Sequence, residues 1–172
     1  MAAPVTLRLR VLTADDWELW RAVRLAALAE APYAFGSRLA DWQGAGDREE
    51  RWRARLSLPG ALDLLAVLDG EPVGQASGVP DEEGRVVRLL SVWAGPRARG
   101  LGVGDALVGE VERWARHAGA RTLELAVSPG NGHARALYRR HGFVDTGRLG
   151  EEVPGGGREQ VWVKELSAPP AR

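Results

Sequence analysis

The sequence predicts a single α/β domain in which a mixed, mostly antiparallel sheet is flanked by helices. Segments with alternating apolar and polar residues, typical of half-buried strands, lie between segments whose apolar residues recur at helical spacing. The Asp69-Gly70 pair between two apolar runs is a strong hairpin signal. At 172 residues the chain is long enough for one buried core and short for two ordinary domains. We therefore expect one domain over residues 1–172, with a core at about 5–166 and a loose C-terminal tail, "SAPPAR".

The pattern also assigns the individual elements. Thr13 and Asp16 resemble a capping box that opens the first helix, and Pro32 ends that helix. The expected helices cover about 15–30, about 47–57, the stretch after Gly102, and "HARALYRRH". The expected strands are "VTLRLRV", "ALDLLAVL", "EPVGQASGV", residues 85–92, "TLELAV", "FVDTGRL" and "REQVWVKEL". The second to fourth strands should form an antiparallel meander.

Helical spacing predicts which side chains of two helices face the core. In the first helix these residues are Leu19, Val23, Ala26 and Ala27. In the helix after Gly102 they are Leu107, Val111, Trp114 and Ala118.

Composition excludes several classes of function. The 23 basic and 23 acidic residues cancel, so the chain lacks the positive charge with which nucleic-acid binders hold phosphates. The absence of cysteine excludes disulfides, thiolate metal sites and a cysteine nucleophile. The three histidines His117, His133 and His141 show neither metal-ligand spacing nor an evident carboxylate partner, so no metal site is expected. No apolar run reaches membrane-spanning length, and the N-terminal residues lack the apolar core of a signal peptide. We expect a cytoplasmic protein without nucleic-acid or membrane partners.

A glycine-rich stretch at the entrance of the third expected helix, "RGLGVG" at residues 99–104, is the first candidate site. Its backbone amides would lie at a helix N-terminus, where the macrodipole favours an anion such as phosphate. Asp105 and Ala106 follow Gly104, so the Gly-Lys-Ser/Thr of a P-loop is missing, and the glycines do not fit G-x-G-x-x-G. Such a stretch also arises as a plain tight turn.

The stretch fits R-x-x-G-x-G, from Arg99 through Gly102 to Gly104, and a second block downstream reads "NGHARALYRRHGF". With these two motifs the sequence resembles the GNAT superfamily of acyl-CoA-dependent N-acyltransferases, whose second block is N-x-x-A-x-x-L-Y-x-x-x-G-F. The order of elements agrees with that family over about residues 5–166. The resemblance implies about seven strands and four helices, with the fourth and fifth strands splayed to admit acetyl-CoA as co-substrate.

The resemblance also implies which residues bind the coenzyme. The coenzyme A pyrophosphate is expected at Arg99, Gly100, Leu101, Gly102, Val103, Gly104 and Asp105. The pantetheine arm would pair with the backbone of Val92, Trp93 and Ala94. The alternative is that these residues only connect the sheet to the loop. Asn131 would contact the same arm, cap the following helix, or do both.

The chemistry implied is attack of a free amine on the acetyl-CoA thioester in one ternary complex. Tyr138 lies where the family often has a tyrosine that protonates the leaving thiolate, and a phenol with a pKa of about 10 suits that role. The alternative is that Tyr138 only packs against the core from an amphipathic helix. Ala126 replaces the glutamate that serves as general base in relatives that acetylate protein N-termini. Glu124, on the same strand face, is the candidate base, although an exposed strand glutamate needs no function.

The acceptor is expected to be a primary amine of a small molecule or peptide. Tyr33, Phe35 and Trp42 lie in a polar loop and either border the acceptor site or anchor the loop on the core. A homodimer is plausible by analogy alone. The alternatives are a non-catalytic acyl-CoA-binding or regulatory domain of the same fold, favoured by the missing base, and a small-molecule sequestering protein.

Overall fold

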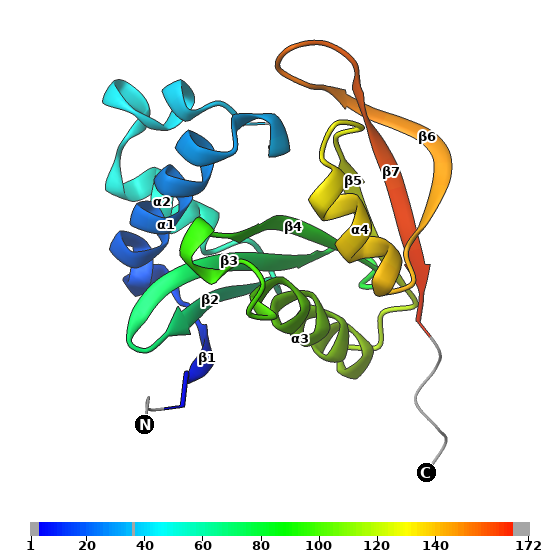
Figure 1. Ribbon diagram of the computed structural model, residues 1–172, viewed down its shortest axis with the longest axis horizontal. Coiled ribbons are helices and arrows are strands. Elements are labelled where there is room, and N and C mark those ends of the chain that lie inside the picture. The colour runs from blue at the N-terminus through cyan, green and yellow to red at the C-terminus, as the bar shows by residue number, and fades with distance from the viewer. Residues whose placement is uncertain (1–3, 36, 167–172) are drawn as a thin grey trace.

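One seven-stranded sheet is the middle layer of the protein (Figure 1). The computed structural model describes residues 4–35 and 37–166, so the expected tail at 167–172 lies outside the described residues. The strands are β1 (Leu7–Val11), β2 (Leu62–Leu68), β3 (Glu71–Pro80), β4 (Val86–Ala94), β5 (Thr122–Val127), β6 (Val144–Glu152) and β7 (Arg158–Glu165). Their order is β1-β2-β3-β4-β5-β7-β6, and β4–β5 is the parallel pair among antiparallel ones. The predicted mixed, mostly antiparallel α/β fold is confirmed.

The hairpin signal is confirmed as well. Asp69 and Gly70 both have positive φ, 48° and 86°, as a type I′ turn requires. The expected three-stranded meander is longer by one strand, because β1 pairs antiparallel with β2.

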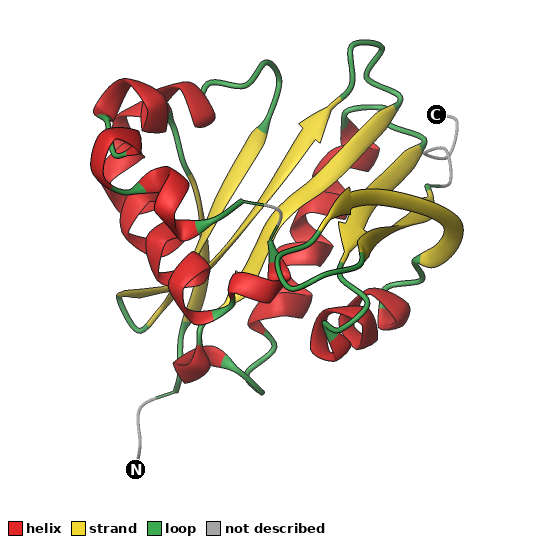
Figure 2. Ribbon diagram, turned by 90° about the horizontal axis from the view of Figure 1, so that it is seen from above, coloured by secondary structure: helices red, strands yellow, loops and turns green. Residues whose placement is uncertain are grey.

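Helices cover both faces of the sheet (Figure 2). They are α1 (Trp17–Glu30), α2 (Glu49–Arg55), α3 (Val103–His117) and α4 (Gly132–Arg140). Successive residues of a strand point to opposite faces. In β2, Leu64 belongs to the core under α3, whereas Leu65 belongs to the core that Trp20 of α1 and Trp52 of α2 fill. Hence α1 and α2 lie on one face of the sheet and α3 on the other.

The buried faces of α1 and α3 differ in part from the predicted ones. In α1 the buried residues are Trp20, Val23, Arg24, Ala27 and Leu28. Leu19 is half-buried and packs at the edge of the core that contains Trp20, whereas Ala26 is exposed. In α3 the buried residues are Val103, Leu107, Val108, Val111 and Ala115. Trp114 is half-buried, and Ala118 is exposed beyond the last helical residue.

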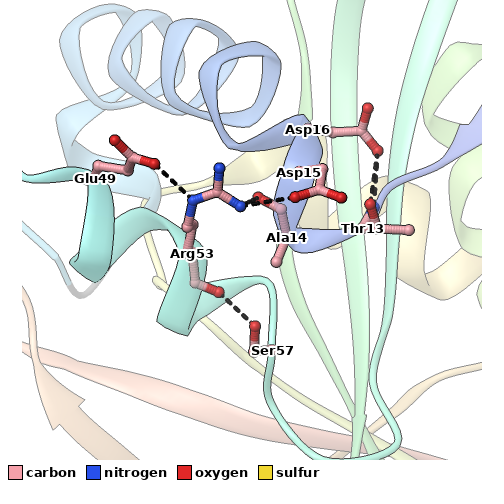
Figure 3. A network of polar contacts seen from close by, with 7 residues as sticks. All are labelled: Thr13, Ala14, Asp15, Asp16, Glu49, Arg53 and Ser57. Carbon is pink, nitrogen blue, oxygen red and sulfur yellow. Dashed lines mark hydrogen bonds and ion pairs between the residues drawn. The ribbon is translucent and has the colours of Figure 1, made fainter.

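A polar network fixes α2 against the start of α1 (Figure 3). As the capping-box pattern predicts, the Asp16 carboxylate accepts a hydrogen bond from the Thr13 backbone N–H at 2.8 Å, although this first turn is a 3₁₀ turn. Arg53 of α2 donates to the carboxylates of Asp15 and Glu49, each at 2.8 Å. These contacts position the loop between α1 and α2, which borders the candidate site.

Candidate active site

The site begins where β4 and β5 separate. Their parallel pairing covers Val86–Arg88 of β4 and Thr122–Glu124 of β5, and the register extends no further. Beyond Arg88, β4 continues to Ala94 without a strand on that side, while β5 pairs with β7 on its other edge. The expected splay of the fourth and fifth strands is therefore present, and it leaves one backbone edge of β4 open.

A β-bulge lies on the open part of β4. Gln75 of β3 pairs with Trp93, and Ser77 pairs with Leu90, so two residues, Ser91 and Val92, face a single residue of β3. Ser91 has a φ of 57°, in the left-handed region that residues other than glycine seldom adopt. A bulge interrupts the hydrogen-bond ladder and redirects the backbone, and bulges are common beside active sites. The bulge thus changes the direction of the β4 backbone where it faces the opening.

The three glycines of the glycine loop, residues 99–104, are required for two different structural reasons. Gly100 and Gly102 both have a φ of 78°, and Gly102 is the N-cap of α3. A Cβ atom on either would meet no atom within 4 Å, so it is the backbone conformation that requires glycine there. At Gly104 a Cβ would come within 3.2 Å of the Leu137 side chain, so this glycine lets α3 and α4 pack closely.

A cavity of about 580 Å³ follows the open edge of β4 into the glycine loop, and we call it the first cavity. Every residue that the resemblance assigned to coenzyme binding lines it, with one exception. The exception is Leu101, whose side chain is half exposed. The free backbone edge, the glycine loop and the N-terminus of a 15-residue helix thus border one continuous space.

Charged side chains at the first cavity are mostly paired. Arg99 forms an ion pair with Glu30 at the end of α1, at 2.7 Å, and the Trp93 indole donates to the same carboxylate at 2.9 Å. In the first turn of α3, the Asp105 carboxylate contacts His141 Nε2 at 2.9 Å. This hydrogen bond, supported by Arg140, holds the pKa of Asp105 below its ordinary value. The expectation that no histidine has a carboxylate partner is therefore wrong for His141, whose partner is distant in the sequence.

A second cavity, of about 420 Å³, lies between the α1–α2 side and the β6–β7 hairpin. It shares Ala34, Val92, Asn131, Ala134 and Tyr138 with the first cavity, so the two spaces meet at these residues.

The aromatic residues of the α1–α2 loop have both expected roles. Phe35 is buried in the core beneath α1, and Trp42 packs on Trp52 with ring centroids 4.6 Å apart. Phe35 and Trp42 also line the second cavity, whereas the half-exposed Tyr33 lines the first. These side chains therefore anchor the loop and border the cavities together.

Tyr138 lies at the junction of the two cavities. Its side chain is 6% exposed, and the phenol ring packs edge-on against Phe143. The Tyr138 hydroxyl forms no hydrogen bond with any other described residue. Burial raises the pKa of Tyr138, so the hydroxyl is protonated at neutral pH. The arrangement leaves a proton donor without a protein partner beside both spaces.

Asn131 is the N-cap of α4, as one of its two expected roles requires. Its side-chain oxygen accepts a hydrogen bond from the Ala134 backbone N–H at 3.3 Å. The residue also lines both cavities, so capping places it at their junction.

Glu124 lies outside both cavities. Its carboxylate contacts Arg148 at 3.1 Å and Arg88 at 3.7 Å. Ala126, two residues further along β5, does line the second cavity. The assignment of Glu124 as the base stays a prediction, and the two arginines are its partners in the structure.

Two other acidic residues, Glu151 of β6 and Glu159 of β7, line the second cavity. Glu159 is 9% exposed, and its burial, together with the negative charge of Glu151, raises the pKa of Glu159. Sequence reasoning missed this pair, because only the register of the β6–β7 hairpin brings the two glutamates together.

Arg24 of α1 also lines the second cavity and was missed. The signal was in the sequence, since an arginine directly after Val23 and four residues after Trp20 falls on the apolar face of the helix. A charged residue on a buried face is uncommon unless it is paired.

Two kinds of feature, a membrane-spanning helix and a cluster of metal ligands, are absent from the described residues. Within residues 4–35 and 37–166 there is no helix that combines the length and the apolar character needed to cross a membrane. The same residues contain no group of three or more potential metal ligands.

Comparison with known proteins agrees with the fold and with acetyl-CoA as co-substrate. The model of the acetyltransferase (GNAT) family matches residues 21–143. An aminoglycoside N(6′)-acetyltransferase type 1 of Stenotrophomonas maltophilia is 34% identical over 135 residues, which cover 74% of this chain and 88% of that protein.

Two solved structures show the same fold. A GNAT acetyltransferase of Streptococcus pneumoniae superposes with a TM-score of 0.75 at 23% identity, over 94% of this chain and all of that one. The protein yncA of Salmonella typhimurium, solved with its cofactor acetyl-CoA, has a TM-score of 0.74 at 20% identity, over 97% and 98% of the two chains. The two motifs, the splayed strands and the family match lead to one conclusion: this chain belongs to the GNAT family of acetyltransferases and is an acetyl-CoA-dependent N-acetyltransferase.

Proposed function

We propose that the protein acetylates a primary amine of a small molecule or peptide by direct attack on acetyl-CoA in a ternary complex. The observation that carries this proposal is the meeting of two cavities at Tyr138, Val92 and Asn131. Acetyl-CoA would occupy the first cavity and the amine the second, so that thioester and nucleophile approach each other at the junction. Alignment of this kind can supply about 7 to 11 kcal/mol of the barrier.

The residues of the first cavity fit acetyl-CoA. The open edge of β4 at Val92, Trp93 and Ala94 can accept the pantetheine amides as an added strand would be accepted. The glycine loop, residues 99–104, offers backbone amides and the positive end of the α3 dipole to the pyrophosphate. Bound acetyl-CoA supplies the activated acetyl group, and the chain supplies orientation.

Two proton transfers remain for side chains. Tyr138 donates its hydroxyl proton toward the leaving sulfur, and it is available for this because the hydroxyl has no partner among the described residues and the side chain lines both cavities. Glu159 accepts the proton of the attacking amine, directly or through water, because its carboxylate borders the acceptor cavity and its burial makes it a better base. Glu124 is the alternative base, and substitution of each carboxylate decides between the two.

The order of events can be tested without knowing the natural acceptor. Direct attack requires both substrates to be bound before any product leaves, so initial rates at varied acetyl-CoA and amine should give intersecting rather than parallel reciprocal plots. Thiol release, measured with a panel of primary amines, provides those rates, and mass spectrometry identifies the acetylated product. Parallel plots, or a chain that gains one acetyl mass when incubated with acetyl-CoA alone, would contradict direct attack.

A further inference from the structure

The wall that α1 contributes to the second cavity contains a buried positive charge without a partner. Arg24 is 8% exposed, and its guanidinium lies over the Phe35 ring at 4.5 Å. Its Nη1 atom is fully buried without a hydrogen-bond partner, and none of its nitrogens forms a hydrogen bond or ion pair with any described residue. An arginine so buried ordinarily has a carboxylate or several carbonyl groups around it.

The nearby charges do not compensate Arg24. Arg55 lines the same cavity, but Asp63 and Ser77 already hold its guanidinium, at 3.0 and 3.1 Å. Burial and the positive charge of Arg55 lower the pKa of Arg24 to about 10, so the guanidinium keeps its charge at neutral pH. This side of the cavity therefore has one uncompensated positive charge among aromatic side chains.

The opposite wall has the reverse polarity. Glu151 and Glu159, on the β6–β7 hairpin, line the same cavity, and neither forms an ion pair with Arg24. In Figure 1 the hairpin and α1 stand on opposite sides of the opening between β4 and β5. A ligand that spans the cavity thus meets a cationic group at one end and anionic groups at the other.

From these contacts we propose that the acceptor is an amino acid or a close analogue, whose carboxylate binds Arg24 while its amine faces Glu159 and Tyr138. The proposal rests on the proposed function, because it identifies the substrate class of the same cavity. A planar guanidinium in an apolar setting matches a single carboxylate through two parallel hydrogen bonds. A polycation such as an aminoglycoside would instead leave Arg24 buried beside further positive charge, which is unfavourable.

Matched ligands test the inference directly. The probes are the proteinogenic L-amino acids and the corresponding L-amino acid amides, titrated calorimetrically into the protein saturated with coenzyme A. We expect at least one free amino acid to bind, and its amide to bind about 10- to 100-fold more weakly. Acetylation rates should show the same preference, although the amide has more unprotonated amine at neutral pH and is chemically favoured.

The Arg24→Met variant provides the second arm, with Arg8→Gln, an exposed position on β1 away from both cavities, as the control. Arg24→Met should abolish the preference for the acid over the amide and raise the Tm of the ligand-free protein, because an uncompensated buried charge is removed. Arg8→Gln should change neither. A purely structural Arg24, packed on Phe35, would instead give a lower Tm with the preference intact.

The outcomes separate this inference from the proposed function. Binding is measured without turnover, so loss of catalysis does not affect it. Equal binding of acid and amide, or binding of the aminoglycoside kanamycin with none of the amino acids, would overturn the inference even if amines are acetylated. Failure of every amine to be acetylated, with amino acid binding and its dependence on Arg24 intact, would overturn the proposed function and leave the second cavity as an amino acid binding site.

Discussion

The ring of Tyr138 packs edge-on against Phe143, with centroids 5.8 Å apart and planes inclined by 63°. This contact, together with the core around it, holds the phenol at the junction of the two cavities. Aromatic pairs of this geometry stabilise a fold through the rings alone. The hydroxyl consequently does not stabilise the fold through a hydrogen bond to any described residue.

Replacement of Tyr138 by phenylalanine should therefore affect catalysis and not stability. If the hydroxyl donates to the leaving sulfur only as the thioester breaks, kcat and kcat/KM should fall together, by about 100-fold, the lower end for general acids. The acetyl-CoA Kd should stay constant, and the Tm should be unchanged or slightly higher. A folded variant with undiminished kcat would end the assignment of Tyr138 as the acid.

Gly102 tests the phosphate role of the glycine loop. Gly102→Asp places a negative charge where the pyrophosphate is expected, but its φ of 78° also imposes strain of about 1 to 2 kcal/mol on any side chain. Gly102→Asn is the matched control, since it has the same shape and strain without the charge. We expect the aspartate variant to bind acetyl-CoA at least 10-fold more weakly than the asparagine variant in calorimetry at low salt. Equal affinities would show that the anion does not bind there.

Asp47, which lines neither cavity, provides a test of stability. Its carboxylate accepts hydrogen bonds from Arg21 of α1 and from the Trp52 indole of α2, and these lower the pKa of Asp47 to about 2. Because the folded pKa is depressed, the stabilisation is present at neutral pH and is lost as the pH falls from about 4 toward 2. Asp47→Asn should lower the Tm at pH 7, and the difference from wild type should shrink in acid. A constant difference at all pH values would contradict this linkage.

The parts of the fold that could be predicted from the sequence are those encoded within a few residues. The Asp69-Gly70 turn, the Asn131 cap and the glycine loop each depend on local backbone conformation. Tyr138, which the second family motif singles out, lines both cavities. The sequence alone could not separate Gly104, required by its contact with Leu137, from Gly102, required by its dihedral angle.

The acceptor side depends on contacts between distant segments, and there prediction was incomplete. Period-two spacing put Glu124 on a plausible face of β5, but no local pattern showed that Arg148 and Arg88 lie beside it. The position of Glu159 depends on the register of a hairpin that contains shifts, which sequence patterns do not define. Glu151 and Glu159 were therefore missed because pairing between two strands places them at the second cavity, whereas Arg24 had a signal in its own helix.

The last prediction concerns the base and compares Glu159→Gln with Glu124→Gln. If Glu159 accepts the amine proton, it must be ionised, so kcat/KM should rise with pH through a step above 4.5, the ordinary glutamate value, because burial raises its pKa. The charged groups around the same cavity are Glu151, Arg24 and Arg55, and none is altered in either variant. Glu159→Gln should lower kcat by about 100-fold and remove that step, whereas Glu124→Gln should retain both.

Stability provides an independent readout of the same pKa. A carboxyl whose pKa is raised in the folded state binds its proton more tightly there than in the unfolded chain, so the free energy of unfolding falls as pH rises through the interval between the two pKa values. The Tm of wild type relative to that of Glu159→Gln should fall over this interval, because the other carboxyls contribute equally to both proteins. A wild-type rate profile in Glu159→Gln, with the step lost in Glu124→Gln instead, would reassign the base to Glu124. Retention of the step in both variants would contradict each carboxylate as the base and leave water as the proton acceptor.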